Sequence, residues 1–365
     1  MARYADRDGL DAARVLIVDD SVVVRAVIAR LIDASDRFSV VGAVGNVAAA
    51  LAFLERATVD VILLDIEMPG IDGLSALPDL IAAGQGAKVL IVSSSADEGG
   101  ATAVRALALG AAETLTKPST SALSTRFGSA LLNKLEMLCE YSAQMPSAPF
   151  VRSPVVPSPR DGRPMPPRPV STSDDYDIVA IGASTGGIHA LNQMFGQMPA
   201  GFRLPIVITQ HLPASFMPYF AAQIAVLAGR PCDVAVDRMR IRPGRIIIAP
   251  GDAHLKAIKL PEGGAAFRLT NEVVASGCMP SVDPMLASLA DVYGARLLAV
   301  ILSGMGRDGA EGARHVHDSG GCVVVQDQRS SVVWGMPGAV ASAGVADAVL
   351  APDAIGRLAA TRRRP

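Results

Sequence analysis

The sequence predicts an α/β protein of two domains, each built on a parallel or mostly parallel sheet, with a linker between them. Short apolar runs alternate with segments of helical spacing along two long stretches, a pattern typical of layered α/β folds. Between these stretches, residues 146–169 hold nine of the 25 prolines, and proline favours extended backbone. We therefore expect an N-terminal tail (1–13), a first domain (14–141), a linker (142–173) and a second domain (174–365).

The composition is that of a globular chain long enough for two domains, since half of its 365 residues are apolar and 19% are charged. A net charge of −2 argues against a broad nucleic-acid surface, so we expect no nucleic-acid partner. The four cysteines show no C-x-x-C pairing, and the first residues are too polar for a signal peptide. No run of about 20 apolar residues could span a membrane, and we expect a cytoplasmic protein without membrane insertion.

Five apolar runs in the first domain predict the strands of a sheet. Helical spacing between them, as in residues 22–32 and 101–109, predicts crossover helices. Strands and helices that alternate in this way predict a doubly wound parallel sheet of five strands. The runs are residues 15–18, 40–44, 61–64, 89–92 and 113–116.

Polar residues stand at the ends of these predicted strands, where a parallel sheet brings them to one edge. A single aspartate there is most simply a solvated loop residue, but five polar positions in register are harder to attribute to chance. Three carboxylates in one place repel one another unless a hard cation such as Mg²⁺ neutralises them, and one could then accept a phosphoryl group. The five residues are Asp19, Asp20, Asp65, Ser93 and Lys117.

Four motifs in this domain resemble the signature segments of response-regulator receiver domains: V-D-D-S (18–21), L-D-I-E-M-P-G-I-D-G (64–73), V-S-S (92–94) and T-K-P (116–118). The resemblance implies that a histidine kinase phosphorylates Asp65 and that Ser93 and Lys117 contact the phosphoryl oxygens. Thr114 departs from the family pattern, which has an aromatic residue three positions before the lysine. The implied Mg²⁺ ligands are Asp19 (assisting), Asp20, Asp65 and the carbonyl of Glu67.

In the second domain, the apolar runs 178–181, 206–210, 296–302 and 322–326 predict buried parallel strands. Residues 254–260 and 265–270 flank P-E-G-G (261–264), which predicts a hairpin. We therefore expect a mostly parallel sheet with an antiparallel hairpin.

The turn after the first of these strands reads G-A-S-T-G (182–186) and has two interpretations. It is either an ordinary tight turn or a G-x-S-x-G turn that presents the Ser184 hydroxyl at the edge of the sheet. A dinucleotide fingerprint is less suitable, because its middle glycine is replaced by Ser184.

Of the five histidines, His211 alone ends a predicted buried strand, and Asp308 lies in the glycine-rich turn after another. A histidine could take the proton of a serine hydroxyl, and an aspartate could orient the imidazole. Each also has a simpler interpretation, as a hydrogen-bonded loop histidine and as a helix N-cap. The backbone N–H groups of Thr185 and Met305, beside glycines, could stabilise an oxyanion. The order Ser, His, Asp differs from that of α/β-hydrolases.

Six motifs then resemble the protein-glutamate methylesterases of bacterial chemotaxis: I-G-A-S-T-G-G (181–187), T-Q-H-L-P (209–213), I-A-P-G-D (248–252), P-S-V-D (280–283), L-S-G-M-G-R-D-G (302–309) and G-M-P (335–337). That family also carries a receiver ahead of its catalytic domain. The resemblance implies Ser184 as nucleophile, His211 as base and Asp308 as orienting acid, with no cofactor in this domain. Residues 277–279 read G-C-M, so the histidine that some members have before P-S-V-D is missing.

This resemblance implies an esterase that removes methyl groups from glutamyl methyl esters of methyl-accepting chemoreceptors, releasing methanol, and that also deamidates receptor glutamines. The receiver is expected to cover Ser184 until Asp65 is phosphorylated. The alternative is a phosphorylation-dependent module that binds a receptor without catalysis.

Overall fold

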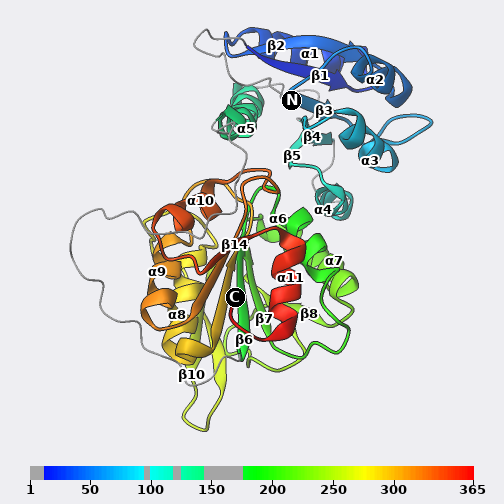
Figure 1. Cartoon of the computed structure of the whole chain (residues 1–365). Helices are drawn as coiled ribbons and strands as arrows, with labels where there is room; N and C mark the ends of the chain where they lie inside the picture. The colour runs from blue at the N-terminus through cyan, green and yellow to red at the C-terminus, as the bar shows by residue number, and fades with distance from the viewer. Residues whose placement is uncertain (1–11, 94–98, 118–124, 144–175) are drawn as a thin grey trace, which may run out of the picture.

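The computed structural model describes residues 12–93, 99–117, 125–143 and 176–365, which form two α/β units (Figure 1). The expected linker, residues 142–173, lies outside the described residues except for its first two positions, which end a helix. Within these described ranges, no helix is both long and apolar enough to cross a membrane.

The first unit is a five-stranded sheet in the order β2-β1-β3-β4-β5, and every pairing is parallel. This confirms the predicted doubly wound sheet, and the fifth strand has the predicted bounds. The strands are β1 (Ala13–Val18), β2 (Phe38–Val44), β3 (Val61–Leu64), β4 (Lys88–Ser93) and β5 (Glu113–Thr116). The helices are α1 (Val22–Asp33), α2 (Val47–Leu54), α3 (Gly73–Ala83), α4 (Gly99–Leu109) and α5 (Thr125–Ala143).

Local sequence explains where the first helices begin. Ser21, Asn46 and Asp72 are the N-caps of α1, α2 and α3, and their side-chain oxygens accept backbone N–H bonds from the first turns. Each such cap typically stabilises a helix by about 1 kcal/mol. Strands β3 and β4 are buried on both faces over nearly their whole length, as in sheets covered by two helical layers.

The second unit is a seven-stranded parallel sheet in the order β14-β13-β12-β6-β7-β9-β8. Its separate hairpin, β10 (His254–Lys259) with β11 (Ala265–Thr270), is antiparallel as predicted. The long central strands match the prediction, whereas three short strands were not predicted: β8 and β14 at the two edges, and β9 next to β8. The parallel strands are β6 (Ile178–Ala183), β7 (Ile206–Gln210), β8 (Cys232–Val234), β9 (Ile246–Ile248), β12 (Leu297–Ile301), β13 (Cys322–Gln326) and β14 (Ala348–Leu350).

Helices cover both faces of this sheet (Figure 1). One layer holds α6 (Gly187–Phe195), α7 (Met217–Ala228) and α11 (Pro352–Thr361), and the other holds α8 (Val282–Tyr293), α9 (Ala310–Asp318) and α10 (Gly335–Ser342). From β6 the chain adds strands on one side through β7 and on the other through β12. The strand order therefore reverses beside β6, and open α/β sheets bind ligands at such a point.

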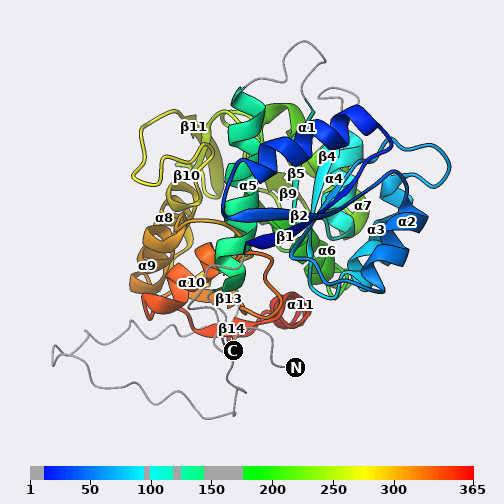
Figure 2. The ribbon, with the colours of Figure 1, turned by 90° about the horizontal axis from the view of Figure 1, so that it is seen from above.

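The first unit rests on the carboxyl edge of this sheet through α4, which lies over α6 and α7 (Figure 2). The carbonyl oxygen of Ala108 accepts hydrogen bonds from Asn192, at 3.2 Å, and from the ring of His189, also at 3.2 Å. Gly100 packs so closely against Tyr219 that a Cβ at position 100 would lie 2.7 Å from its ring. The two units are therefore in direct contact beside the turn that carries Ser184.

We expect Gly186→Ala to destabilise the second unit by about 3 kcal/mol or more. Gly186 has φ +76°, and a Cβ there would lie 2.5 Å from Val332 and 2.8 Å from the Ser303 hydroxyl, so backbone strain and overpacking add. The chain has one tryptophan, Trp334, and it lies in this unit. Its fluorescence during guanidinium unfolding therefore measures the unfolding free energy of this unit.

Gly263→Ala is the matched control, because Gly263 has φ +94° but nothing lies within 4 Å of its Cβ position. It should cost only the strain of the left-handed conformation, about 1–2 kcal/mol. Equal losses of unfolding free energy in the two variants would show that close packing around Gly186 adds nothing to the cost of backbone strain.

Candidate active site

Ser184 lies in the turn between β6 and α6, at the point where the strand order reverses. Its backbone is fixed on both sides: its N–H donates to the Ser303 carbonyl at 3.0 Å, and its carbonyl accepts from the Gln210 side chain at 2.9 Å. The turn after β12 packs against it, since a Cβ at Gly304 would lie 2.8 Å from the Cβ of Ser184. The turn thus holds a partly exposed serine on a rigid backbone.

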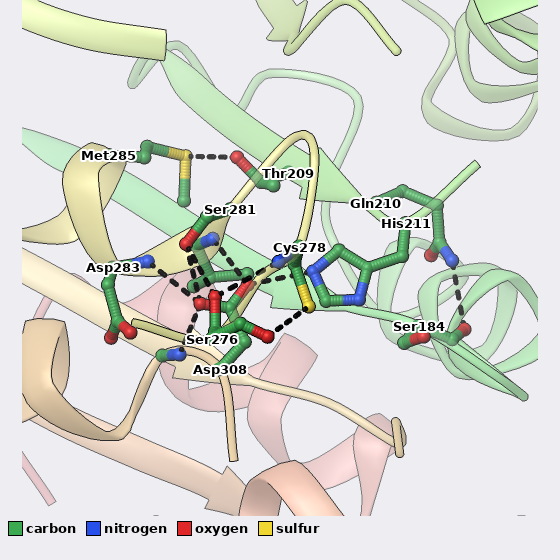
Figure 3. A network of polar contacts seen from close by, with 12 residues as sticks. Ser184, Thr209, Gln210, His211, Ser276, Cys278, Ser281, Asp283, Met285 and Asp308 are labelled. Atoms are coloured by element: carbon green, nitrogen blue, oxygen red, sulfur yellow. Dashed lines mark hydrogen bonds and ion pairs between the residues drawn. The ribbon is translucent and has the colours of Figure 1, made fainter. Parts of the chain in front are cut away.

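His211 and Asp308 are in contact, as their positions after β7 and β12 predict (Figure 3). The Nε2 atom of His211 lies 2.8 Å from Oδ2 of Asp308, and the His211 N–H donates to the carbonyl of Ala183 at 3.0 Å. Within the described residues, no hydrogen bond joins the Ser184 hydroxyl to His211, although both line one pocket. Of the two contacts expected in a Ser184–His211–Asp308 triad, the structure therefore contains the one between His211 and Asp308. The Ser184 hydroxyl is not bonded to His211.

Asp308 is almost fully buried, and its carboxylate is surrounded by donors. The Ser281 hydroxyl donates to it at 2.6 Å, and the N–H groups of Val282 and Gly309 donate at 2.7 and 3.1 Å. Burial alone would raise the pKa of Asp308, but the bonds from His211, Ser281 and Val282 outweigh it and lower the pKa to about 2. The carboxylate is therefore ionised at neutral pH. The simpler N-cap interpretation is wrong, because Gly309 occupies the N-cap of α9.

Behind Asp308, the buried His254 holds the Ser281 backbone. Its Nδ1 accepts the Ser281 N–H at 3.0 Å, and its Nε2 contacts the carbonyl of Glu272 at 2.9 Å, which fixes a neutral tautomer with the proton on Nε2. Neither Ser281 nor His254 was singled out from the sequence. The P-S-V-D motif contains Ser281, but the motif alone did not indicate what this serine does.

The two backbone groups expected to hold an oxyanion lie on the two turns that meet at Ser184. Thr185 is buried, whereas Met305 is 46% exposed. In the part of the chain that the structure describes, no hydrogen bond occupies the N–H of Thr185 or of Met305. Both groups are therefore available, as an oxyanion site requires.

The first unit closes one side of the pocket around Ser184. Its residues Leu107, Ala112 and Glu113 line this pocket together with Ser184 and His211. The Thr185 hydroxyl donates to Oε2 of Glu113 at 3.1 Å, and Lys134 lies 3.4 Å from Oε1 of the same carboxylate. A carboxylate of the first unit therefore lies at the entrance to the candidate site, a contact that the sequence did not predict.

The expected phosphorylation site lies at the carboxyl edge of the five-stranded sheet. Asp19, Asp20 and Asp65 offer carboxylate oxygens within 4.8 Å of one another, and Lys117 lies 2.7 Å from both Asp19 and Asp65. Burial raises the pKa of Asp65 despite the opposing effect of Lys117. Oxygen ligands at this spacing fit a hard divalent cation. Ser93 ends β4 at the same edge, and the Glu67 N–H donates to Asp65 at 3.2 Å.

Two family models match the chain: response regulator receiver domain over residues 15–126 and CheB methylesterase over residues 179–358. A protein-glutamate methylesterase/protein-glutamine glutaminase of Paramagnetospirillum magneticum is 43% identical over 96% of this chain and 96% of its own length. The corresponding proteins of Rhodospirillum centenum and Rhodospirillum rubrum are 40% identical over 95% and 92% of this chain, and over 93% and 92% of their own lengths. The chain belongs to the protein-glutamate methylesterase/protein-glutamine glutaminase family. Membership confirms both resemblances drawn from the motifs, and the similarity extends across the receiver and the methylesterase domain.

We expect Asp308 to contribute about 2 kcal/mol to the stability of the methylesterase domain above about pH 4. Its pKa is about 2 in the folded protein against 3.8 ordinarily, so this stability is lost as the pH falls from about 4 to 2. Unfolding followed by Trp334 fluorescence at several pH values should show this loss in the wild type and a smaller one in Asp308→Asn.

Asp283→Asn is the control, because Asp283 is a neighbouring carboxyl whose shift has the opposite sign: burial and the nearby Asp308 charge raise its pKa to about 6. Asp283→Asn should still lose unfolding free energy as the pH falls from about 4 to 2. The same acid dependence in Asp308→Asn as in the wild type would contradict the assignment.

Proposed function

We propose that this protein is a phosphorylation-controlled serine hydrolase that removes methyl groups from glutamyl methyl esters of methyl-accepting chemoreceptors and deamidates receptor glutamines. The observation that carries the proposal is an ionised, buried Asp308 bonded to His211 beside Ser184. The names of the relatives support the substrate, because all three are protein-glutamate methylesterases/protein-glutamine glutaminases.

In the proposed reaction, Ser184 Oγ attacks the γ-carbonyl carbon of the ester while His211 takes the hydroxyl proton. Because Nε2 of His211 contacts Asp308, the proton goes to Nδ1, and the Asp308 charge stabilises the resulting cation. The N–H groups of Thr185 and Met305 stabilise the oxyanion, and one such donor typically lowers the barrier by about 3 kcal/mol. The protonated His211 then gives its proton to the leaving methoxide, which departs as methanol.

Water completes the cycle. His211 removes a proton from a water molecule, whose oxygen attacks the acyl carbon, and the bond to Ser184 breaks as Oγ recovers the proton. A receptor glutamine reacts in the same way and releases ammonia. The attack requires the Ser184 hydroxyl to reach Nδ1, and this contact is not formed in the receiver-covered structure.

The receiver acts as an inhibitor of this site in our proposal. Its α4 occupies the surface of α6 and α7, and its Glu113 binds Thr185 at the pocket entrance. Phosphorylation of Asp65 by a histidine kinase would weaken this docking and open the pocket to a receptor segment. Strand β5 has Glu113 at its first position and leads into Lys117, so one short strand links the pocket to the phosphorylation site.

Phosphorylation itself depends on the acidic edge of the receiver. Asp19, Asp20, Asp65 and the carbonyl of Glu67 are the groups proposed to hold Mg²⁺, which would neutralise charge on the phosphoryl group when bound. Ser93 and Lys117 are proposed to contact its oxygens. No disulfide joins the cysteines in the part of the chain that the structure describes, which supports a reducing compartment, and we place the protein in the cytoplasm.

We expect Ser184→Ala and His211→Gln each to lower methanol release from methylated receptor membranes by roughly 10⁴-fold or more. His315→Gln is the matched control, because His315 forms a 2.7 Å pair with Asp291 on the exposed surface. It should keep activity within about twofold. Equal methanol release from the wild type and Ser184→Ala would instead favour the non-catalytic receptor-binding module.

We expect Glu113→Ala to raise methanol release by the unphosphorylated protein about threefold to tenfold, because it removes a hydrogen bond to a charged group that holds the receiver in place. Glu136→Ala, which breaks a pair with Arg37 within the receiver, should leave the unphosphorylated activity unchanged. Deleting residues 1–145 should raise activity further. Activity that is unchanged or lower after this deletion would show that the receiver does not inhibit.

A further inference from the structure

We propose that Cys278, His211 and Asp308 form a binding site for Zn²⁺ whose occupation switches the active site off. Cys278 lies in the loop before α8, and its sulfur lies beside the His211 ring, in contact with the Ser276 carbonyl at 3.8 Å (Figure 3). One ligand atom from each of the three residues lies within 4.8 Å of the other two. The part of the chain that the structure describes holds one other such cluster, the acidic edge of the receiver.

The spacing suits a tetrahedral metal with small adjustments. Zn²⁺ binds nitrogen and oxygen at about 2.0–2.2 Å and sulfur at about 2.3 Å, which places neighbouring ligand atoms about 3.4–3.6 Å apart. The His211 and Asp308 atoms are 2.8 Å apart and must separate slightly, whereas the sulfur must approach by at most about 1.4 Å. A water molecule would be the fourth ligand.

His211 and Cys278 make these movements, and Asp308 does not. Asp308 is held by Ser281 and by backbone N–H groups, so it is the fixed ligand. Cys278 follows Gly277, which has φ +67° and no atom within 4 Å of its Cβ position, and precedes the exposed Met279. The cysteine therefore belongs to a loosely packed segment that can close on a metal.

The ligand types select a metal different from that of the receiver. A thiolate and an imidazole favour Zn²⁺, whereas the carboxylates of Asp19, Asp20 and Asp65 favour Mg²⁺. Burial and the charge of Asp308 raise the pKa of Cys278, so the free site holds a thiol. Metal binding would release that proton as the sulfur–zinc bond forms.

Zinc at this position would disable the base that the proposed function requires. A neutral imidazole that binds a metal through Nε2 carries its proton on Nδ1, and Nδ1 then has no lone pair for the proton of Ser184. Asp308, as a zinc ligand, would no longer stabilise a histidine cation. The loss of activity rests on the proposed hydrolase function, whereas the binding of zinc does not.

Binding is tested with Co²⁺ as an optical substitute for Zn²⁺, added to the full chain in excess Mg²⁺ so that the receiver site is occupied. The wild type should show one thiolate-to-cobalt charge-transfer band at one metal per chain, removed by added Zn²⁺. Cys278→Ser and Cys278→Ala should lose the band and bind Zn²⁺ more than tenfold more weakly in competition with a chromogenic chelator. Cys232→Ser, which changes another partly buried cysteine, should keep the band.

Methanol release is then measured with and without Zn²⁺, and each variant is compared with its own zinc-free rate. Zinc should inhibit the wild type and Cys232→Ser at concentrations more than tenfold lower than Cys278→Ser, and a chelator should restore activity. A missing band in the wild type, or a band that persists in Cys278→Ser, would overturn the site. Equal inhibition of the wild type and Cys278→Ser would overturn its regulatory role. A protein that binds metal but releases no methanol would contradict the proposed function and leave the metal site in place.

Discussion

The buried charge of Asp308 is the constraint on which the rest of the methylesterase domain depends. A carboxylate taken out of water is costly unless donors surround it, and here they come from His211, Ser281, Val282 and Gly309. These donors lie on three separate segments of the chain, so the charge fixes the relative positions of the turns after β7 and β12 and of the start of α8. His254 extends the same network by holding the Ser281 backbone. Gly304 also contributes to this arrangement, because the absence of a side chain lets the turn after β12 approach Ser184 closely.

The second feature of the molecule is that its two domains meet through one face of the receiver, formed by α4 and the start of β5. The carboxylate of Glu113 accepts hydrogen bonds from the Thr185 hydroxyl and from the backbone N–H of Thr114. It also forms an ion pair with Lys134. The Glu113 carboxylate therefore joins two groups of the receiver to one group of the methylesterase domain. An apolar core continues from α4 into α6 and α7, so polar and apolar contacts act together at this boundary. Thr114, where many receivers carry an aromatic residue, lies beside Glu113 on β5 and does not provide a bulky side chain for switching.

Most of the fold was predictable from sequence because its strands are long and apolar and its helices have clear spacing. The bounds of β3, β5, β7, β11 and β13 agree with the apolar runs, whereas the short strands β8, β9 and β14 carry too few residues to show a period. The site was predictable where polar residues end buried strands, as for Ser184, His211 and Asp308. Ser281, His254 and Glu113 were missed because they act through partners from 27 to 72 positions away, and no local pattern records such a contact. Whether Asp308 caps a helix or contacts His211 was likewise decided only by the folded chain.

The docking of α4 uses a main-chain acceptor, the carbonyl of Ala108, for both of its hydrogen bonds with α6. A carbonyl is supplied by every residue type, so substitutions at position 108 that keep the helix and fit the space leave these bonds intact. The side chains that recognise it, His189 and Asn192, belong to the methylesterase domain. A substitution at position 108 can therefore keep both hydrogen bonds, whereas a substitution of His189 or Asn192 removes one of them. At this contact, the specificity of domain docking is therefore encoded in the methylesterase domain and not in the receiver.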